Sequence, residues 1–207
     1  MSDDLAGYEV VVGVCGGIAA YKVCSVVSNL VQRGAGVQVA MTKAARKFIG
    51  PVTFQALTAR PVFRTLWRSH DDRGQQHIQL TESADLMLVA PATANMIGKV
   101  THGIADDLVS TMVLSADCPV MFAPSMNERL WNNTVVQANV KNLQQEGYFF
   151  VGPDKGWLAC RTVGAGRLAE PSTIVEAVAR QLRSDPPRKS AESEPRAQAT
   201  GQVKSEE

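Results

Sequence analysis

The chain of 207 residues has the length of one ordinary domain and the composition of a globular protein, with 45% hydrophobic and 20% charged residues. Its net charge of +1 gives no reason to expect a nucleic-acid partner or an anionic membrane surface. The apolar runs are too short to span a bilayer, and acidic residues stand where the basic region of a signal peptide would be. We therefore expect a cytoplasmic protein.

Alternating strand and helix patterns run along most of the chain. Short apolar runs predict strands at residues 9–14, 36–41, 86–90, 119–123 and 148–151. Helical spacing occupies residues 18–33, 44–49, 94–100, 105–114, 135–145 and 174–182, with Pro51 interrupting or restarting the second helix. The polar residues 68–76 are expected to form a loop that leads through 77–83 to the third strand. This order predicts an α/β domain built on a parallel sheet.

The composition changes at Ser184. Residues 184–207 carry three prolines and mixed charges, with only alanines and one valine as apolar residues. Such a segment buries too little surface to offset its ordering entropy. We expect a domain over residues 1–183 and a disordered polar tail over 184–207.

The four cysteines form no CxxC pair and no compact cluster with histidine, so we expect no metal site. Cys15, Cys24 and Cys118 are interpreted as small buried hydrophobic residues. Cys160 differs because it lies in a glycine-rich loop that also carries Arg161 and Arg167, where a thiol can be mobile and its pKa lowered. An inert loop cysteine is the alternative interpretation.

Ligands of parallel sheets bind beyond the carboxyl ends of the strands, and small residues gather there in this chain. Gly16 and Gly17 follow the first strand, where they favour either a plain tight turn or a contact with a phosphate or ring. The run is neither GxGxxG nor a phosphate-binding P-loop. No acidic residue follows the second strand, where Thr42 and Lys43 stand. This argues against NAD and leaves a mononucleotide open.

Two further runs follow the third and fourth strands. Thr93 and Asn95 of the run Pro91-Ala-Thr-Ala-Asn95 could bind a ligand or simply cap a helix. Asn127 of the run Pro124-Ser-Met-Asn-Glu-Arg-Leu-Trp131 could hold a carboxylate or an amide. The alternative for this second run is a helix start whose Met126 and Trp131 lie in the core.

Together these motifs resemble the flavin-containing cysteine decarboxylases, over residues 8 to about 183. The matching stretches are Gly16-Gly-Ile-Ala-Ala-Tyr-Lys22, His77 with Ala84-Asp85, Pro91-Ala-Thr-Ala-Asn95, Gly103-Ile-Ala-Asp-Asp-Leu108, Pro124-Ser-Met-Asn-Glu-Arg-Leu-Trp131 and Leu158-Ala-Cys-Arg-Thr-Val-Gly-Ala-Gly-Arg-Leu168. Each motif is weak alone, and the ordered set is specific. Within the family the chain is most similar to the enzymes that decarboxylate 4'-phosphopantothenoylcysteine to 4'-phosphopantetheine in coenzyme A biosynthesis.

The resemblance implies a Rossmann-like (flavodoxin-like) three-layer fold, FMN as cofactor and a homo-oligomer built from trimers. It implies contacts to FMN from Gly16, Gly17, Ile18, Thr42, Lys43, Ala44, Thr93, Ala94, Asn95, Met96 and Ser125. Met126 and Asn127 would bind the substrate, with Asn127 on its carboxylate. His77 would be the active-site base, and Cys160 would donate a proton from a flap over the substrate. We expect a small-molecule substrate, no nucleic acid and no membrane.

The chemistry of the substrate is consistent with these roles. A cysteine carboxylate has no electron sink, and oxidation of its C–S bond to a thioaldehyde by a flavin supplies one. Histidine suits proton transfer near neutral pH. Outside the family context, a lone histidine such as His77 is more often a surface or internally bonded residue, and His70 and His102 are interpreted in that way.

The chain departs from the family pattern at several positions. Ser125, Leu130 and Leu168 are small changes, whereas Arg161 and Thr162 replace a Gly-Asp pair after the flap cysteine and bear on the flap geometry. The bifunctional bacterial form continues into a synthetase domain, so we expect that second activity to reside elsewhere.

Three alternative functions remain open. One is a decarboxylase of C-terminal peptidyl-cysteine. Another is a flavin prenyltransferase, which the Met-Asn and Ala-Cys runs disfavour. The last is a non-catalytic flavin-binding regulator, a class marked by long acidic extensions that this chain lacks.

Overall fold

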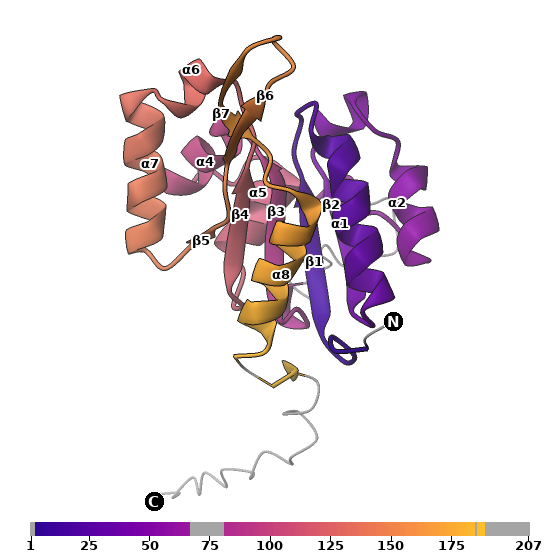
Figure 1. Ribbon diagram of the computed structural model, residues 1–207. Coiled ribbons are helices and arrows are strands. Elements are labelled where there is room, and N and C mark those ends of the chain that lie inside the picture. The colour runs from indigo at the N-terminus through magenta and orange to yellow at the C-terminus, as the bar shows by residue number, and fades with distance from the viewer. Residues whose placement is uncertain (1–2, 67–80, 185, 189–207) are drawn as a thin grey trace, which may run out of the picture.

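The computed structural model describes residues 3–66, 81–184 and 186–188. They form a three-layer α/β fold in which helices cover both faces of a central sheet (Figure 1). The strands of this sheet are β1 (Glu9–Val14), β2 (Gly36–Met41), β3 (Leu86–Ala92), β4 (Val120–Pro124) and β5 (Phe149–Phe150). They lie in the order β2-β1-β3-β4-β5, and every neighbouring pair is parallel. The predicted α/β class and parallel sheet are confirmed.

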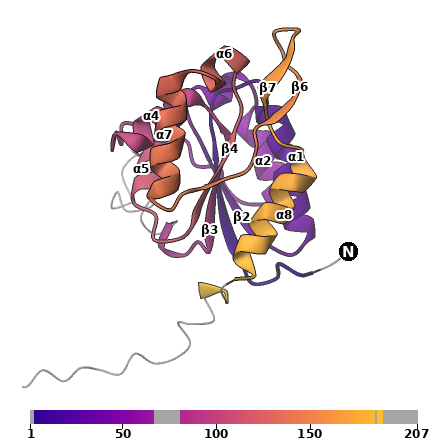
Figure 2. The ribbon, with the colours of Figure 1, turned by 60° about the vertical axis from the view of Figure 1, so that its left-hand side comes forward.

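The helices lie on the two faces of the sheet, as Figures 1 and 2 both show. The first face is covered by α1 (Ala20–Gln32), α2 (Pro51–Thr58) and α8 (Pro171–Leu182), and the second by α4 (Ala94–Thr101), α5 (Leu108–Leu114) and α7 (Thr134–Gln145). Successive strand residues point to opposite faces, so Val10 and Val12 join the first core while Val11 joins the second. This double burial explains the uninterrupted apolar strands.

Element boundaries follow local chemistry. A short 3-10 turn (Ala45–Lys47) precedes α2, which starts afresh with Pro51 at its first position. The predicted helix over residues 105–114 was too long at its start, because α5 begins only at Leu108. The side chain of Asp107 accepts the backbone N–H groups of Val109 and Ser110, each at 3.0 Å, and so caps the helix there.

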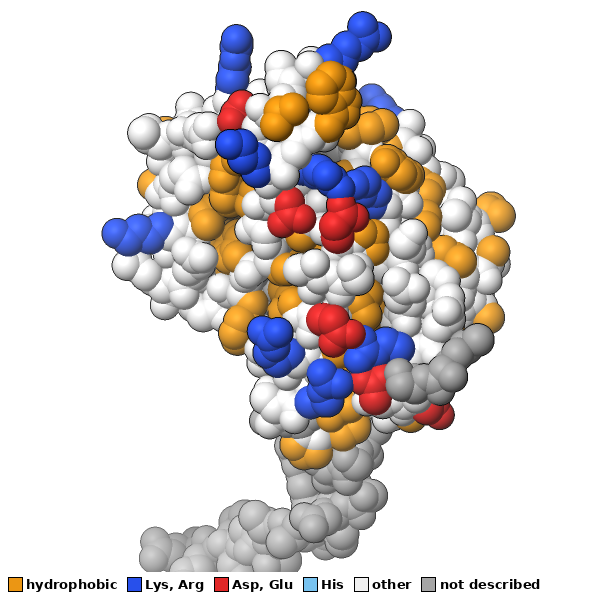
Figure 3. Space-filling model, in the orientation of Figure 1, with side chains coloured by type: hydrophobic (Ala, Val, Ile, Leu, Met, Phe, Trp, Pro, Cys, Tyr) orange, Lys and Arg blue, Asp and Glu red, His pale blue; other side chains and the backbone are white. Residues whose placement is uncertain are grey.

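Sequence patterns did not predict a second, two-stranded sheet. It is an antiparallel hairpin of β6 (Asp154–Trp157) and β7 (Val163–Arg167), which projects from the carboxyl end of the main sheet (Figure 1). A one-turn helix, α6 (Glu128–Trp131), lies beside it. In the same orientation, Figure 3 shows several Lys and Arg side chains around an exposed apolar group at this end of the molecule.

The segment after α8 differs from the expected contact-free tail at its beginning. The backbone N–H of Arg188 donates to Asp85 Oδ1 at 2.6 Å, and the Arg188 guanidinium contacts the backbone oxygen of Asp117. Asp85 lies just before β3, and its second carboxylate oxygen accepts the backbone N–H of Glu9 at 2.7 Å. Residues 189–207 lie outside the described part of the chain.

The described ranges contain no helix that is long and apolar enough to cross a lipid bilayer.

Candidate active site

A cavity of about 670 Å³ lies at the carboxyl ends of β1, β3 and β4. The loops after these strands form its floor, and the β6–β7 hairpin forms one wall. Its lining comprises Gly16, Gly17, Ile18, Ala19, Tyr21, Lys22, Thr93, Ala94, Asn95, Ser125, Met126, Asn127, Leu130, Trp157, Leu158, Ala159, Cys160, Gly166, Arg167 and Leu168. The structure therefore brings together residues from four of the six motifs found in the sequence.

The glycine turn after β1 serves packing as well as access. A Cβ on Gly16 would lie 2.9 Å from the carbonyl carbon of Ala44, so the loops after β1 and β2 can meet only at a glycine. Gly17 is less constrained, because the nearest atom to its Cβ would be Pro91 Cγ at 3.7 Å. Helix α1 then begins with no side-chain cap and no acidic residue in its first turn, and its positive amino end lies at the cavity.

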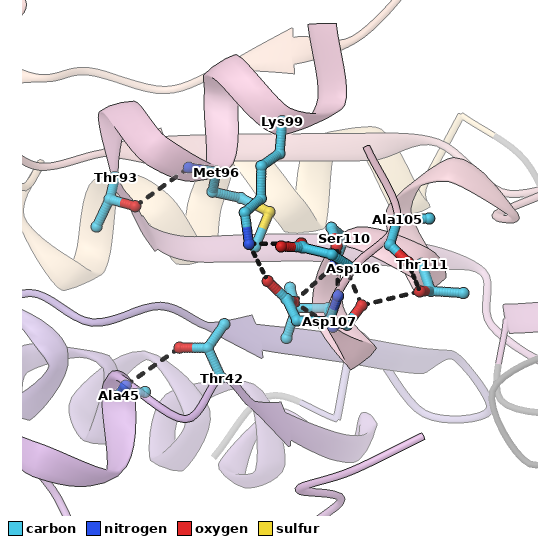
Figure 4. Close-up of polar contacts among 11 residues, drawn as sticks. Thr42, Ala45, Thr93, Met96, Lys99, Ala105, Asp106, Asp107, Ser110 and Thr111 are labelled. Carbon is cyan, nitrogen blue, oxygen red and sulfur yellow. Dashed lines mark hydrogen bonds and ion pairs between the residues drawn. The ribbon is translucent and has the colours of Figure 1, made fainter. Parts of the chain in front are cut away.

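The loop after β2 lies beside the cavity and does not line it in the described part of the chain. Thr42 Oγ1 accepts the N–H of Ala45 at 3.1 Å, which turns the chain into the 3-10 helix (Figure 4). Lys43 and Ala44 are exposed. The hydroxyl of Thr42 is thus already engaged within its own loop.

In the loop after β3, the structure assigns helix capping to Thr93 and leaves Asn95 exposed at the cavity. Thr93 caps α4, since its hydroxyl accepts the N–H of Met96 at 3.3 Å (Figure 4). Asn95 is exposed and lines the cavity, so its amide is available to a ligand. The side chain of Met96 is buried in the second core and does not line the cavity.

The loop after β4 presents Asn127 in a fixed orientation. Its Oδ1 accepts the N–H of Arg129 at 2.9 Å and caps α6, and its Nδ2 donates to Cys160 Sγ at 3.3 Å. Because the cap requires the carbonyl oxygen, the amide nitrogen must face the hairpin. Neighbouring Ser125 donates its backbone N–H to Ala92 O at 3.0 Å. Met126 lines the cavity and also packs against the core, whereas Trp131 only packs at the core edge.

Cys160 sits in the turn of the hairpin. It is the one exposed cysteine of the four, and Thr162 Oγ1 lies 3.1 Å from its Sγ. Burial raises the pKa of Cys15 to about 12 and that of Cys118 to about 11, so those thiols stay protonated. The following Arg161 has φ of 65°, a left-handed conformation that favours glycine. Cys160 is therefore the most accessible of the four thiols, because Cys15 and Cys118 are buried and Cys24 is half-buried.

Four apolar side chains at the rim of the cavity are exposed: Ile18 (58%), Tyr21 (59%), Leu130 (49%) and Trp157 (64%). Sequence reasoning did not single out Tyr21, Leu130 or Trp157 as site residues, although all three lie within or next to its motifs. An apolar mouth of this kind suits a planar ligand or a second protein surface.

The Gly103–Leu108 motif forms an ion-pair cluster with Lys99 (Figure 4), and Lys99, Asp106 and Asp107 do not line the cavity. Lys99 Nζ lies 2.6 Å from Asp106 Oδ1 and 2.8 Å from Asp107 Oδ2. Partial burial disfavours the charge on Lys99, but the two carboxylates outweigh it and raise the pKa of Lys99. Lys99 in turn lowers the pKa of Asp106. The cluster joins α4 to the start of α5.

His77, the expected base, lies outside the described residues, as does His70. His102 is exposed, and its Nδ1 lies 2.8 Å from the backbone oxygen of Gly98. Within the described ranges, no group of three His, Cys, Asp or Glu could hold a metal ion.

Comparisons with known proteins agree with this geometry. A family model described as Flavoprotein matches residues 1–183. The coenzyme A biosynthesis bifunctional protein CoaBC of Bacillus subtilis (strain 168) is 46% identical over 168 residues, which cover 81% of this chain and 41% of that protein. CoaBC of Escherichia coli (strain K12) is 44% identical over 172 residues, covering 83% of this chain and 42% of that protein. The chain thus spans about two fifths of the length of these relatives.

Two solved structures are similar over nearly their full length. One is a cysteine-to-serine mutant of a PPC decarboxylase complexed with pantothenoylaminoethenethiol, with a TM-score of 0.76 and 28% identity over 86% of this chain and 99% of that chain. The other is the FMN-dependent cysteine decarboxylase SpaF, with a TM-score of 0.74 and 33% identity over 87% of this chain and 98% of that chain. The chain therefore belongs to the Flavoprotein family and, within it, to the flavin-dependent cysteine decarboxylases.

Proposed function

We propose that this chain is an FMN-dependent carboxy-lyase that converts 4'-phosphopantothenoylcysteine to 4'-phosphopantetheine. The observation that carries the proposal is the pairing of Asn127 with Cys160 at the cavity wall, where Nδ2 and Sγ are 3.3 Å apart. It places an amide donor suited to a carboxylate beside a thiol that can give up a proton. The similarity to CoaBC and to a PPC decarboxylase supports this substrate over others.

The cavity residues fit a flavin mononucleotide. The amino end of α1, a helix of 13 residues with no side-chain cap, lies at the cavity and its dipole favours a phosphate there, and the Asn95 amide can bond the polar edge of a ring. The apolar side chains of Ile18 and Leu158 line the same cavity and suit the body of the ring. When bound, FMN would supply reversible two-electron redox chemistry, in which the electron pair taken from the substrate before CO₂ loss returns to the product, so that no external oxidant is needed.

The remaining roles belong to side chains of this chain. One hydrogen of Asn127 Nδ2 bonds Cys160, and the other is free to donate to a substrate carboxylate oxygen. Cys160 then gives its proton to the product carbon, and Asn127 and Thr162 hold its sulfur in place. Leu158, which is buried and lines the cavity, restricts water on the hairpin side of the site. His77 is the proposed base that accepts a proton early in the reaction.

We also propose a homo-oligomer built from trimers, working in the cytoplasm. The exposed apolar side chains Ile18, Tyr21 and Trp157 at the cavity rim support this assembly, because a neighbouring subunit would remove them from water. The near-neutral net charge of +1 is consistent with a small-molecule enzyme that needs no nucleic acid or membrane surface.

The test is direct turnover. The purified full chain, supplied with FMN, is incubated with 4'-phosphopantothenoylcysteine while CO₂ and 4'-phosphopantetheine are quantified. His77→Asn should lower turnover by about 10²–10⁴-fold, as expected for loss of a general acid–base group, and should leave flavin bound. His102→Asn is the matched control and should retain activity, because His102 is exposed and does not line the cavity.

Other outcomes would contradict particular parts of the proposal. A protein that takes up no FMN would refute the cofactor and the mechanism together. Turnover of a peptide ending in cysteine, without turnover of the phosphopantothenoyl substrate, would refute the substrate alone. Bound flavin without turnover of either compound would indicate a non-catalytic flavin-binding regulator.

A further inference from the structure

The hairpin that carries Cys160 is not part of the main sheet. Strands β6 and β7 pair only with each other in the described structure. A two-stranded hairpin is marginally stable by itself, so contacts with the body of the protein must fix its position. The place of Cys160 over the cavity depends on those contacts.

Strand β7 meets the body of the protein at α6, as Figure 1 shows. The N–H of Met126 donates to Gly166 O at 2.9 Å, just before the helix. Two residues further on, Glu128 Oε1 accepts the N–H of Ala165 at 3.3 Å. The Glu128 side chain thus bonds the middle of β7, and Asn127, its neighbour in sequence, bonds the thiol at the turn of the hairpin.

Gly164 provides a second, independent sign that the Glu128 carboxylate belongs here. Gly164 is buried, and a Cβ at this position would lie 2.6 Å from Glu128 Oε1. Its φ lies outside the left-handed region, so the backbone itself does not require glycine. The missing side chain leaves the space that the carboxylate occupies.

We infer that Glu128 is a positioning residue that clamps β7 to α6 and thereby holds Cys160 beside Asn127. The carboxylate accepts a hydrogen bond from the strand and contacts no reacting atom. The inference rests on the proposed function only for its effect on turnover. The clamp itself can be measured without substrate.

The structural test is amide hydrogen exchange of the full-length protein with FMN present, read on peptides that cover residues 154–167. Glu128→Ala should raise exchange of these peptides by about tenfold, the effect expected for losing one hydrogen bond to a charged acceptor. Peptides from α7 serve as the internal reference and should not change. Glu128→Gln should restore most of the protection, because its amide oxygen can accept the same bond.

Gly164→Ala makes the test specific. Its Cβ should displace the flexible carboxylate and raise hairpin exchange as Glu128→Ala does. In the double variant Glu128→Ala/Gly164→Ala the carboxylate that the new Cβ would displace is absent. Hairpin exchange in the double variant should therefore equal that in Glu128→Ala alone. Unchanged exchange in Glu128→Ala, or fully additive effects in the double variant, would overturn the clamp.

The functional arm separates the clamp from the proposed reaction. Glu128→Ala should leave CO₂ release in the first turnover near the wild-type level. The reason is that Asn127 still caps α6 with its own side chain, so its amide keeps its orientation toward the cavity. It should slow formation of 4'-phosphopantetheine severalfold, because the proton donor is displaced. Raised hairpin exchange with an unchanged rate of product formation would support the positioning role of Glu128 but refute the proposed role of Cys160 as proton donor.

Discussion

Asp107→Ala tests whether the Gly103–Leu108 motif stabilises the fold or takes part in chemistry. The Asp107 carboxylate accepts two N–H groups of α5, each at 3.0 Å, and pairs with Lys99 at 2.8 Å. Loss of an N-terminal cap costs about 1 kcal/mol. Loss of a partly exposed ion pair adds at most about 1 kcal/mol, and Lys99 keeps Asp106 as a partner.

The expected destabilisation is therefore about 1–2 kcal/mol, which lowers the melting temperature of a chain of this size by about 2–8 °C. Thermal unfolding followed by circular dichroism, at equal FMN saturation, measures it. Asp106→Ala is the matched control, because Asp106 pairs with the same lysine but is 58% exposed and caps nothing. Its melting temperature should fall by clearly less.

Activity and flavin content of Asp107→Ala at 25 °C should match the wild type, since Lys99, Asp106 and Asp107 do not line the cavity. Equal destabilisation by the two substitutions would refute the capping argument. Loss of flavin or activity in a folded Asp107→Ala protein would show that the motif acts on the site.

Three further predictions concern the hairpin and the C-terminal segment. Cys160→Ser should release CO₂ once but stall before product, because a hydroxyl is a far weaker acid than a thiol; sustained turnover would mean that another group donates the proton. Arg161→Gly should raise the free energy of unfolding, measured in urea, by up to about 1 kcal/mol, because glycine adopts the left-handed φ of 65° without steric cost. A lower stability would refute the argument that Arg161 is strained. Truncation after Arg188 should leave the free energy of unfolding unchanged, whereas truncation after Arg183 should lower it. The shorter chain loses the hydrogen bonds of Arg188 to Asp85 and Asp117. Equal stability of the two truncated chains would show that these bonds contribute nothing.

The main sheet could be predicted because its strands are short, apolar and separated by helical spacing. Residues 9–14 and 36–41 match β1 and β2 at both ends. The β6–β7 hairpin lacks that signal, since β6 is Asp-Lys-Gly-Trp and β7 contains two glycines. Gly164 lies against Glu128 and Gly166 against Met126, and a contact between segments distant in sequence leaves no periodic pattern.

The sequence predicted which loops form the candidate site. It could not predict which side chain of each loop faces the cavity, because that depends on contacts with neighbouring residues in the fold. The spacing of Thr93 and Asn95 was compatible with either as the cap, and only the backbone geometry shows that Thr93 caps while Asn95 faces the cavity. Met96 belongs to a motif associated with the cofactor, yet its side chain packs in the core. Tyr21 and Trp157 entered the site because the fold exposes them at its rim.

Helix α6 links the Asn127 amide and the hairpin that carries Cys160 into one structural unit. A single helical turn of four residues has little stability of its own, so its geometry depends on its cap and its neighbours. Asn127 supplies that cap with one end of its amide and reaches Cys160 with the other. Glu128, the first residue of the helix, bonds β7. A displacement of α6 would therefore move the Asn127 amide and the hairpin with its thiol together, which is what the proposed mechanism needs if both groups act on one substrate.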